Sequence, residues 1–229
     1  MTHTKPNLVS VELHLHTCGS EDSLVKVDRL LAHCERIGLD KVAITDHNSI
    51  EQAKIAHQKY PDRVIIGEEI ETTQGEILGY FMKEWVPPHL SPMETIKRLR
   101  DQGAVISVSH PFDIHRSSPW TEDQLTAIVP YIDAIEVFNA RCMTQKPNQQ
   151  ADAFAREHGL SGTVGSDAHS IWEVGRAVLE MAEFSGAAEF KTGLVNAEVK
   201  ATLSPACVHL FSRFAFIFNK LKGFSLRDC

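Results

Sequence analysis

The stretch SVELHLH at residues 10–16 decides the fold, because it predicts a strand that ends in two histidines. Four more β-rich runs carry histidine or carboxylate residues at or near their ends. They are KVAITDH at residues 41–47, RVIIGEEIET at 63–72, AVISVSH at 104–110 and GTVGSDAH at 162–169. Runs with helical spacing of apolar residues lie between them. An alternation of strands and helices predicts a parallel sheet covered by helices.

A barrel fits this α/β pattern better than an open dinucleotide-binding sheet. At least five strand–helix units follow one another, and the chain contains neither GxGxxG nor GxxxxGK[ST]. A further strand is expected at residues 75–83, after a turn at Gln74–Gly75. Ser91 precedes Pro92 and lies three residues before Glu94, which predicts a capped helix start. The last strong pattern is an amphipathic helix from Ser204 to Leu221.

The composition is that of a soluble globular protein, with 43% hydrophobic and 23% charged residues among 229. The formal net charge of −7 argues against bulk electrostatic attraction to nucleic acid, so no stable nucleic-acid complex is expected. No apolar run is long enough to predict a transmembrane helix, and no membrane partner is expected. An odd cysteine count without a CxxC pair, and an N-terminus without an apolar signal region, predict a cytoplasmic location.

The side chains at the strand ends are those that bind transition metals. In a parallel barrel the carboxyl ends of the strands meet at one mouth, where functional residues gather. Residues i and i+2 of a strand point to the same side, so His14 and His16 can reach one ion, and so can Asp167 and His169. Imidazole with carboxylate suits Zn²⁺, Mn²⁺ or Fe²⁺. Because burying so many ionisable groups without an ion is costly, we predict a polynuclear metal site.

The motifs HLHTCGSEDS, AITDHNSI, IIGEEI, SHPF and GSDAH, in this order, resemble those of the PHP (polymerase and histidinol phosphatase) family. The resemblance spans about residues 8–180. It implies a distorted (β/α)7 TIM-like barrel with two or three divalent ions, and hydrolysis of phosphate esters. We expect the barrel over residues 8–200. A C-terminal amphipathic helix over residues 201–229 is expected to pack on the barrel or on a second copy of the chain, as in a homo-oligomer.

The resemblance also implies how the ligands are shared among the ions. The first ion would take His14, His16, Glu69 and Asp167, the second Glu69 and His110, and the third Asp22, His47 and His169. Glu76 stands where relatives often carry a histidine, and it is a further candidate ligand of the second ion. The acidic ligand after HLHT is either Glu21 or Asp22, and the SxDS form found in part of the family favours Asp22.

Other residues are candidates for contacts with the substrate. Arg116 follows SHPF, and a guanidinium can hold phosphate oxygens in a bidentate way; the alternative is a solvated loop arginine. His115 is a candidate general acid. Glu136, Asn139 and Arg141 alternate along a predicted strand, so Asn139 and Arg141 are candidate substrate contacts, with packing of the barrel interior as the alternative.

These features together predict a metal-dependent phosphoric ester hydrolase. Its substrate would be a small phosphometabolite, a nucleotide or the end of an oligonucleotide. The attacking group would be a hydroxide that bridges two ions, with Glu69 as the shared catalytic carboxylate. Two alternatives stay open: a metal-dependent hydrolase of C–N or C–O bonds, of amidohydrolase type, and a regulatory module with structural metals. Shared ligands and an open barrel mouth argue against the second, since structural zinc sites are usually closed.

Overall fold

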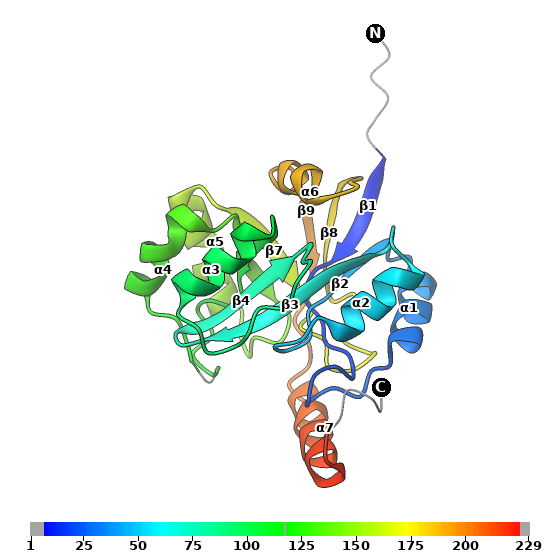
Figure 1. Ribbon diagram of the computed structural model, residues 1–229. Helices are drawn as coiled ribbons and strands as arrows, with labels where there is room; N and C mark the ends of the chain where they lie inside the picture. Colours follow the sequence, from blue (N-terminus) through cyan, green and yellow to red (C-terminus); the bar gives the residue numbers. More distant parts are fainter. Residues whose placement is uncertain (1–6, 117, 225–229) are drawn as a thin grey trace.

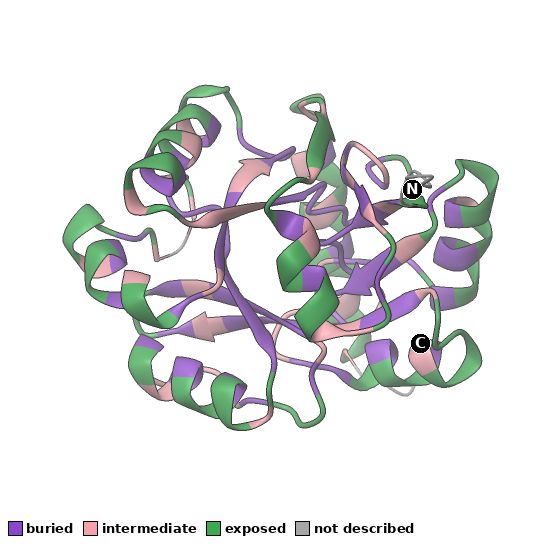
Figure 2. Cartoon of the chain, turned by 90° about the horizontal axis from the view of Figure 1, so that it is seen from above, coloured by how far each residue is buried: buried purple, intermediate pink, exposed green. Residues whose placement is uncertain are grey.

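Nine strands form a single sheet in the computed structural model, which describes residues 7–116 and 118–224. The sheet curls into a nearly closed barrel, and helices surround it (Figures 1 and 2). The strands follow the order β7-β6-β5-β4-β3-β2-β1-β8-β9 across the sheet. Their bounds are β1 (Leu8–Glu12), β2 (Lys41–Ile44), β3 (Val64–Thr72), β4 (Gly75–Tyr80), β5 (Val105–Val108), β6 (Ala134–Asn139), β7 (Ser161–Gly165), β8 (Ala177–Ala182) and β9 (Glu198–Ala201).

The barrel closes through the segments that follow β1 and β7. The backbone N–H of Asp167 donates to the carbonyl of His14, and the N–H of His16 donates to the carbonyl of Ala168, both at 2.8 Å. A parallel bridge between Leu15 and Ala168 completes this pairing. The two predicted histidine-bearing strand ends therefore lie side by side, although one lies at residues 14–16 and the other at residues 167–169.

The helices cover the outside of the sheet with their buried stripes turned inward (Figure 2). Their bounds are α1 (Val27–Arg36), α2 (Glu51–Lys59), α3 (Pro92–Asp101), α4 (Glu122–Ile128), α5 (Lys146–His158), α6 (Ala187–Leu194) and α7 (Val208–Lys222). Ser91 caps α3 as expected, because its hydroxyl accepts a hydrogen bond from the N–H of Glu94. The Glu94 side chain pairs with Arg98 instead of completing a capping box. A complete capping box occurs at α4, between Thr121 and Gln124.

The expected α/β barrel is present, but its sheet is mixed rather than parallel throughout, and the count of seven strand–helix units is not reproduced. The pairs β3–β4, β4–β5, β1–β8 and β8–β9 are antiparallel. The predicted turn at Gln74–Gly75 makes β3 and β4 a hairpin, and a link this short cannot hold the crossover that parallel strands need. Gly75 has φ +115°, and a Cβ there would meet the Trp120 ring 2.4 Å away. The edge strand β9 was not predicted.

Three clusters of buried apolar residues hold the fold. One fills the barrel interior, where Leu13, Tyr80 and Phe190 are fully buried. A second lies between the sheet and helices α3, α4 and α5, and a third lies against α1 and α2. A fully buried aliphatic or aromatic side chain contributes ~1.5–3 kcal/mol, so these layers supply most of the driving force for folding.

Helix α7 extends from the end of the barrel toward which β1 runs (Figure 1). It packs on the barrel through one face, where Val208 and Ala215 are buried and the Asn219 side chain donates to the carbonyl of Glu21 at 2.7 Å. The opposite face exposes Phe214 and Leu221, among other apolar residues. No helix in the described part of the chain is long and apolar enough to cross a membrane. The predicted domain boundary at residues 200–201 falls at the end of β9.

Glu68 generates a prediction about stability and pH. Its carboxyl group is buried on the outer side of β3, accepts one hydrogen bond from the N–H of Val86 at 3.1 Å, and leaves Oε1 without a partner. Burial raises its pKa from 4.5 to about 8, so the folded protein binds a proton that the unfolded chain has lost. The free energy of unfolding should therefore fall between pH 4.5 and about 8, by up to about 5 kcal/mol at ~1.4 kcal/mol per pKa unit.

We expect Glu68→Gln to remove this loss, because the amide stays neutral and can still accept from Val86. The free energy of unfolding of the wild type and the variant is measured by urea unfolding across this pH range. Glu84→Gln, at an exposed position, is the control and should keep the wild-type slope. An unchanged slope in Glu68→Gln would contradict a neutral, buried Glu68.

Candidate metal centre

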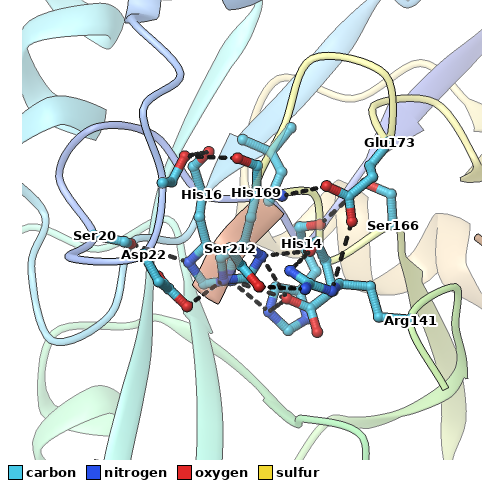
Figure 3. Close-up of polar contacts among 12 residues, drawn as sticks. His14, His16, Ser20, Asp22, Arg141, Ser166, His169, Glu173 and Ser212 are labelled. Atoms are coloured by element: carbon cyan, nitrogen blue, oxygen red, sulfur yellow. Dashed lines mark hydrogen bonds and ion pairs between the residues drawn. The ribbon is translucent and has the colours of Figure 1, made fainter. Parts of the chain in front are cut away.

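Five buried side chains from three segments form the floor of a polar cluster at the barrel mouth. Three of them, His14, His16 and His169, are labelled in Figure 3. His14 and His16 follow β1, Glu69 lies in β3, and Asp167 and His169 follow β7. The Nε2 atom of His14 lies 3.2 Å from Glu69 Oε1. The Nε2 atom of His16 lies 3.3 Å from Glu69 Oε2 and 3.2 Å from Asp167 Oδ1. The i, i+2 spacing thus places both histidines on one site, as the sequence predicted.

The partners of the Nδ1 atoms fix the tautomer of each floor histidine. His14 Nδ1 faces the Glu136 carboxylate at 2.9 Å, and His169 Nδ1 faces the Asp167 carbonyl at 2.8 Å. Both partners are acceptors, so each Nδ1 carries a hydrogen, and Nε2 is the ring atom that can bind a metal once it is deprotonated. The Nε2 atoms of His14 and His16 are only 3.3 Å apart, so both can face one ion.

The cluster also holds buried carboxylate oxygens without hydrogen-bond partners, which a cation would satisfy. Glu69 Oε2, Asp167 Oδ1 and Asp22 Oδ1 are buried without a hydrogen-bond partner. An uncompensated buried carboxylate oxygen is costly. Within the described residues, three overlapping groups bring one ligand atom per residue to within 4.8 Å of one another. They are His14, His16 and Glu69; His47, Glu69 and Glu76; and His16, His47 and His169. These imidazole and carboxylate donors fit divalent transition-metal ions.

Four further candidate ligands form the more open edge of the cluster. His110 Nε2 lies 3.0 Å from Glu69 Oε1 and 3.3 Å from Glu76 Oε2. Asp22 Oδ2 lies 2.9 Å from His169 Nε2, whereas Glu21 is exposed, so the geometry favours Asp22 over Glu21. His47 sits between the second and third predicted groups, 3.1 Å from Glu69 and 3.8 Å from Asp22. The side chains of His47 and Asp22 are 30% and 28% exposed, so this edge faces solvent.

Charge within the cluster keeps its acidic ligands ionised. Burial alone would raise the pKa of Asp167, but Arg116 and His14 outweigh it and hold that pKa well below its ordinary range. Burial acts the same way on Asp22, whose pKa is nevertheless lowered by His169 and His47. Burial and the neighbouring Glu69 carboxylate raise the pKa of Glu76. Glu76 is thus the carboxyl group whose ionisation gains most from a nearby cation.

Two of the candidate ligands have strained backbones. Asp167 has φ +54° and His110 has φ +25°, in a region that non-glycine residues seldom adopt. Hydrogen bonds hold both: the N–H of Asp167 donates to His14, and the N–H of His110 donates to Glu136 Oε2 at 2.8 Å. Such strain costs ~1–3 kcal/mol per residue and persists at functional sites, where the surrounding structure enforces it.

Ser20 and Asp46 support the site from behind, in an arrangement that no pattern in the sequence predicts. The Ser20 hydroxyl donates to Asp46 Oδ1 at 2.9 Å. Its oxygen must then accept from His16 Nδ1 at 3.1 Å and from the backbone N–H of His47 at 3.0 Å. Asp46 also accepts from the N–H and hydroxyl of Thr17, both at 2.6 Å. Asp46 therefore orients His16 through Ser20 and fixes the loop, rather than bonding the neighbouring His47 ring.

Glu136 and Asn139 form a second support under His14 and Asp167. A β-bulge at Val137 shifts the register between Glu136 and Phe138, so residues 136 and 139 reach the same face. The Asn139 amide donates to Glu136 Oε2 at 3.0 Å and to Asp167 Oδ2 at 3.2 Å. Asn139 is fully buried and engaged with these groups. Its predicted contact with substrate therefore stays a prediction, whereas its contact with Asp167 is observed.

The two candidate substrate arginines differ in position. Arg116 donates to Asp167 Oδ2 at 2.5 Å and to Asp113 Oδ2 at 3.1 Å, and its side chain is 23% exposed at the rim. Arg141 is buried, and its Nη2 donates to the hydroxyl of Ser212 in α7 at 2.7 Å. Its Nε lies 3.5 Å from Glu173, so Arg141 ties α7 to the loop that carries His169 (Figure 3). A substrate contact for Arg141 stays a prediction.

His115 lies on the exposed loop beside Arg116. The structure gives a hydrogen bond for its backbone N–H, which donates to Asp113 Oδ1 at 3.1 Å. Among the described residues, no contact joins its imidazole to the cluster. A role of His115 as general acid therefore stays a prediction.

Two family models match the chain. A PHP domain covers residues 12–132, and a PHP-associated domain covers residues 145–197. The chain belongs to the PHP family. Seven of the nine candidate ligands lie in the matched PHP domain, and the other two, Asp167 and His169, lie in the PHP-associated domain. Family membership and the His/Glu clusters together support a metal-dependent hydrolase.

Two relatives come from the archaeon Methanocaldococcus jannaschii. Uncharacterized protein MJ0417 is 35% identical over 180 residues, which are 77% of this chain and 72% of the relative. Uncharacterized protein MJ1587 is 35% identical over 146 residues, which are 58% of this chain and 82% of the relative.

Solved structures share the fold at lower identity. A two-domain protein from Bacteroides vulgatus that contains a predicted PHP-like metal-dependent phosphoesterase aligns with TM-score 0.71 and 18% identity, over 86% of this chain and 66% of that one. PsfC from Pseudomonas syringae aligns with TM-score 0.65 and 18% identity, over 94% and 99% of the two chains. The lesion-specific endonuclease PfuEndoQ from Pyrococcus furiosus aligns with TM-score 0.62 and 16% identity, over 84% and 58%.

Ser20 provides a direct test of how the PHP site is supported. Ser20→Ala removes the acceptor that holds His16 Nδ1 and the His47 N–H, so both rings lose their fixed orientation. Loss of such a supporting group costs ~10–100-fold in metal affinity. The metal affinity of each variant is measured by competition with a chromogenic chelator. Ser49→Ala is the matched control, because the Ser49 hydroxyl accepts from Glu51 at the start of α2. Equal affinities in both variants would contradict the proposed support.

Proposed function

We propose that this PHP protein hydrolyses phosphate esters with two or three divalent ions, Zn²⁺, Mn²⁺ or Fe²⁺. The observation that carries the proposal is the convergence of four imidazole rings on the buried Glu69 carboxylate. Its Oε1 lies within 3.2 Å of His14 and His110, and its Oε2 within 3.3 Å of His16 and His47. A carboxylate that meets four histidines through both oxygens is suited to be shared between ions.

Bound divalent ions would supply an activated water and offset charge on the phosphate. The residues of the chain determine where this happens. His14, His16, Glu69 and Asp167 would hold the deepest ion, while His110 with Glu76, and His47 with Asp22, line the open edge where substrate arrives. Ser109 holds the central carboxylate, because its hydroxyl donates to Glu69 Oε1 at 2.6 Å.

Arg116 supports a phosphate ester over other substrates. Its guanidinium stands at the rim, next to the ligand Asp167, and is partly exposed. We infer that it binds the non-bridging oxygens of a phosphate at the ions, where a planar cation stabilises developing charge. Among structural neighbours, PfuEndoQ is an endonuclease and the Bacteroides protein contains a predicted phosphoesterase, which supports the same chemistry.

Two other functions remain candidates. Hydrolysis of C–N or C–O bonds would use the same ions, but it would leave the exposed part of the Arg116 guanidinium at the rim with no phosphate to bind. A non-catalytic module with structural metals would be expected to close its ligand cages, whereas the edge formed by His47 and Asp22 is open to solvent. Both are therefore weaker proposals than phosphate ester hydrolysis.

We also propose a substrate class, a location and an assembly state for the enzyme. The substrate would be a phosphometabolite, a nucleotide or an oligonucleotide end, and the expected location is the cytoplasm. We also propose self-association through α7, because Leu210, Phe214, Ile217 and Leu221 form an exposed stripe at helical spacing on its outer face. A concentration-independent monomer in light scattering would exclude it.

A substrate panel tests the proposed function. The protein, loaded separately with Mn²⁺, Zn²⁺ or Fe²⁺, is assayed against phosphate mono- and diesters, and against amides and lactones as controls. We expect turnover of at least one phosphate ester and none of the controls. Turnover of an amide or lactone alone would assign the protein to the C–N or C–O hydrolases.

Arg116→Lys gives the residue-level prediction. Lysine keeps the positive charge next to Asp167 but cannot reproduce the planar fork, so we expect kcat/KM to fall ~10-fold or more while metal content stays at the wild-type level. Arg100→Lys, at an exposed site on α3, is the control. If kcat/KM is unchanged in Arg116→Lys, the residue is a solvated loop arginine.

A further inference from the structure

A cavity of about 600 Å³ lies beside the metal centre, between α1, the loop after His169 and α7. None of the residues that line it except His169 belongs to the candidate ligand set. Its walls are mainly apolar, and its cationic side chains come from α1. The residues that the argument uses are Arg29, Arg36, His169, Trp172, Phe211 and Phe214.

His169 joins the cavity to the metal centre. It lines the cavity, and its Nε2 lies 2.9 Å from Asp22. Its ring centroid is 4.2 Å from that of His16 and 5.8 Å from that of His47. The His169 ring therefore stands between a group held at the ions and the cavity. This distance is short enough for one small molecule to occupy both places.

The walls of the cavity favour a flat aromatic group. Trp172 and Phe211 meet edge to face with ring centroids 5.6 Å apart, and Trp172 is 70% exposed. An exposed tryptophan next to a site is unusual without a partner, since large apolar side chains gain free energy when covered. Aromatic walls stack well on a ring, and the exposed guanidinium groups of Arg29 and Arg36 add cationic surface at the same cavity.

We propose that this cavity binds an aromatic ring carried by the alcohol that is esterified to the phosphate, with a nucleobase as the best-fitting ring. The inference rests on the proposed phosphoesterase function. The phosphate would lie at the ions and Arg116, and the ring would stack on Trp172 and Phe211. A polyol leaving group would leave these apolar walls uncovered, and an alkyl chain would gain nothing from the arginines.

The test compares one aromatic and one polyol ester. With adenosine 5′-monophosphate, Trp172→Ala should raise KM roughly 10-fold or more, the effect that loss of base–aromatic stacking has elsewhere. With glycerol 3-phosphate, kcat/KM should change less than about twofold, because the phosphate contacts remain. Phe211→Ala should follow Trp172→Ala. Phe216→Ala is the matched control, since Phe216 is an exposed phenylalanine of α7 that does not line the cavity.

A binding measurement separates this inference from the proposed function. Adenosine, which has no phosphate, should quench the fluorescence of Trp172 in the metal-loaded protein and lose this effect in Trp172→Ala. Quenching without turnover of any ester would sustain the subsite and reject the phosphoesterase. Turnover of glycerol 3-phosphate without adenosine binding, equal effects of Trp172→Ala on both esters, or a preference for octyl phosphate over the nucleotide would overturn the subsite.

Discussion

The pairing of the segment after β1 with the segment after β7 is the constraint on which the site depends. Two backbone hydrogen bonds, from Asp167 to His14 and from His16 to Ala168, close the barrel mouth. They bring His14 and His16 next to Asp167 and His169, which are distant from them in the sequence. The cluster that results holds imidazole nitrogens against buried carboxylate oxygens, an arrangement that cations stabilise.

Around this cluster, buried polar side chains hold the candidate ligands in position. Glu136 fixes His14, Ser20 with Asp46 fixes His16, and Glu173 accepts from the backbone N–H of His169 at 3.2 Å. The Nδ1 partners of His14 and His16 orient these rings with Nε2 inward, whereas Glu173 holds the backbone of the loop that carries His169. Arg141 extends the network to Ser212, so the C-terminal helix is connected to the loop that carries Asp167 and His169.

Much of this could be predicted from the sequence, because the ligands lie at the ends of short strands, where local pattern and barrel geometry agree. The α/β barrel, the helix start at Ser91, and the gathering of His14, His16, Glu69 and His110 follow from such patterns. The strand β9 and the antiparallel pairs β4–β5, β1–β8 and β8–β9 did not, since strand direction depends on contacts distant in sequence. The bulge at Val137 and the support from Ser20 were likewise invisible, because a buried serine has no distinctive spacing.

The most direct test of the account is elemental analysis of the wild type, Glu69→Gln and Glu68→Gln, purified side by side without chelator. These neighbours on β3 point to opposite sides of the strand, one into the cluster and one away from it. The wild type and Glu68→Gln should each contain at least two equivalents of transition metal, and Glu69→Gln should contain clearly less. A wild type with less than one equivalent, or a loss confined to Glu68→Gln, would contradict the shared-carboxylate centre.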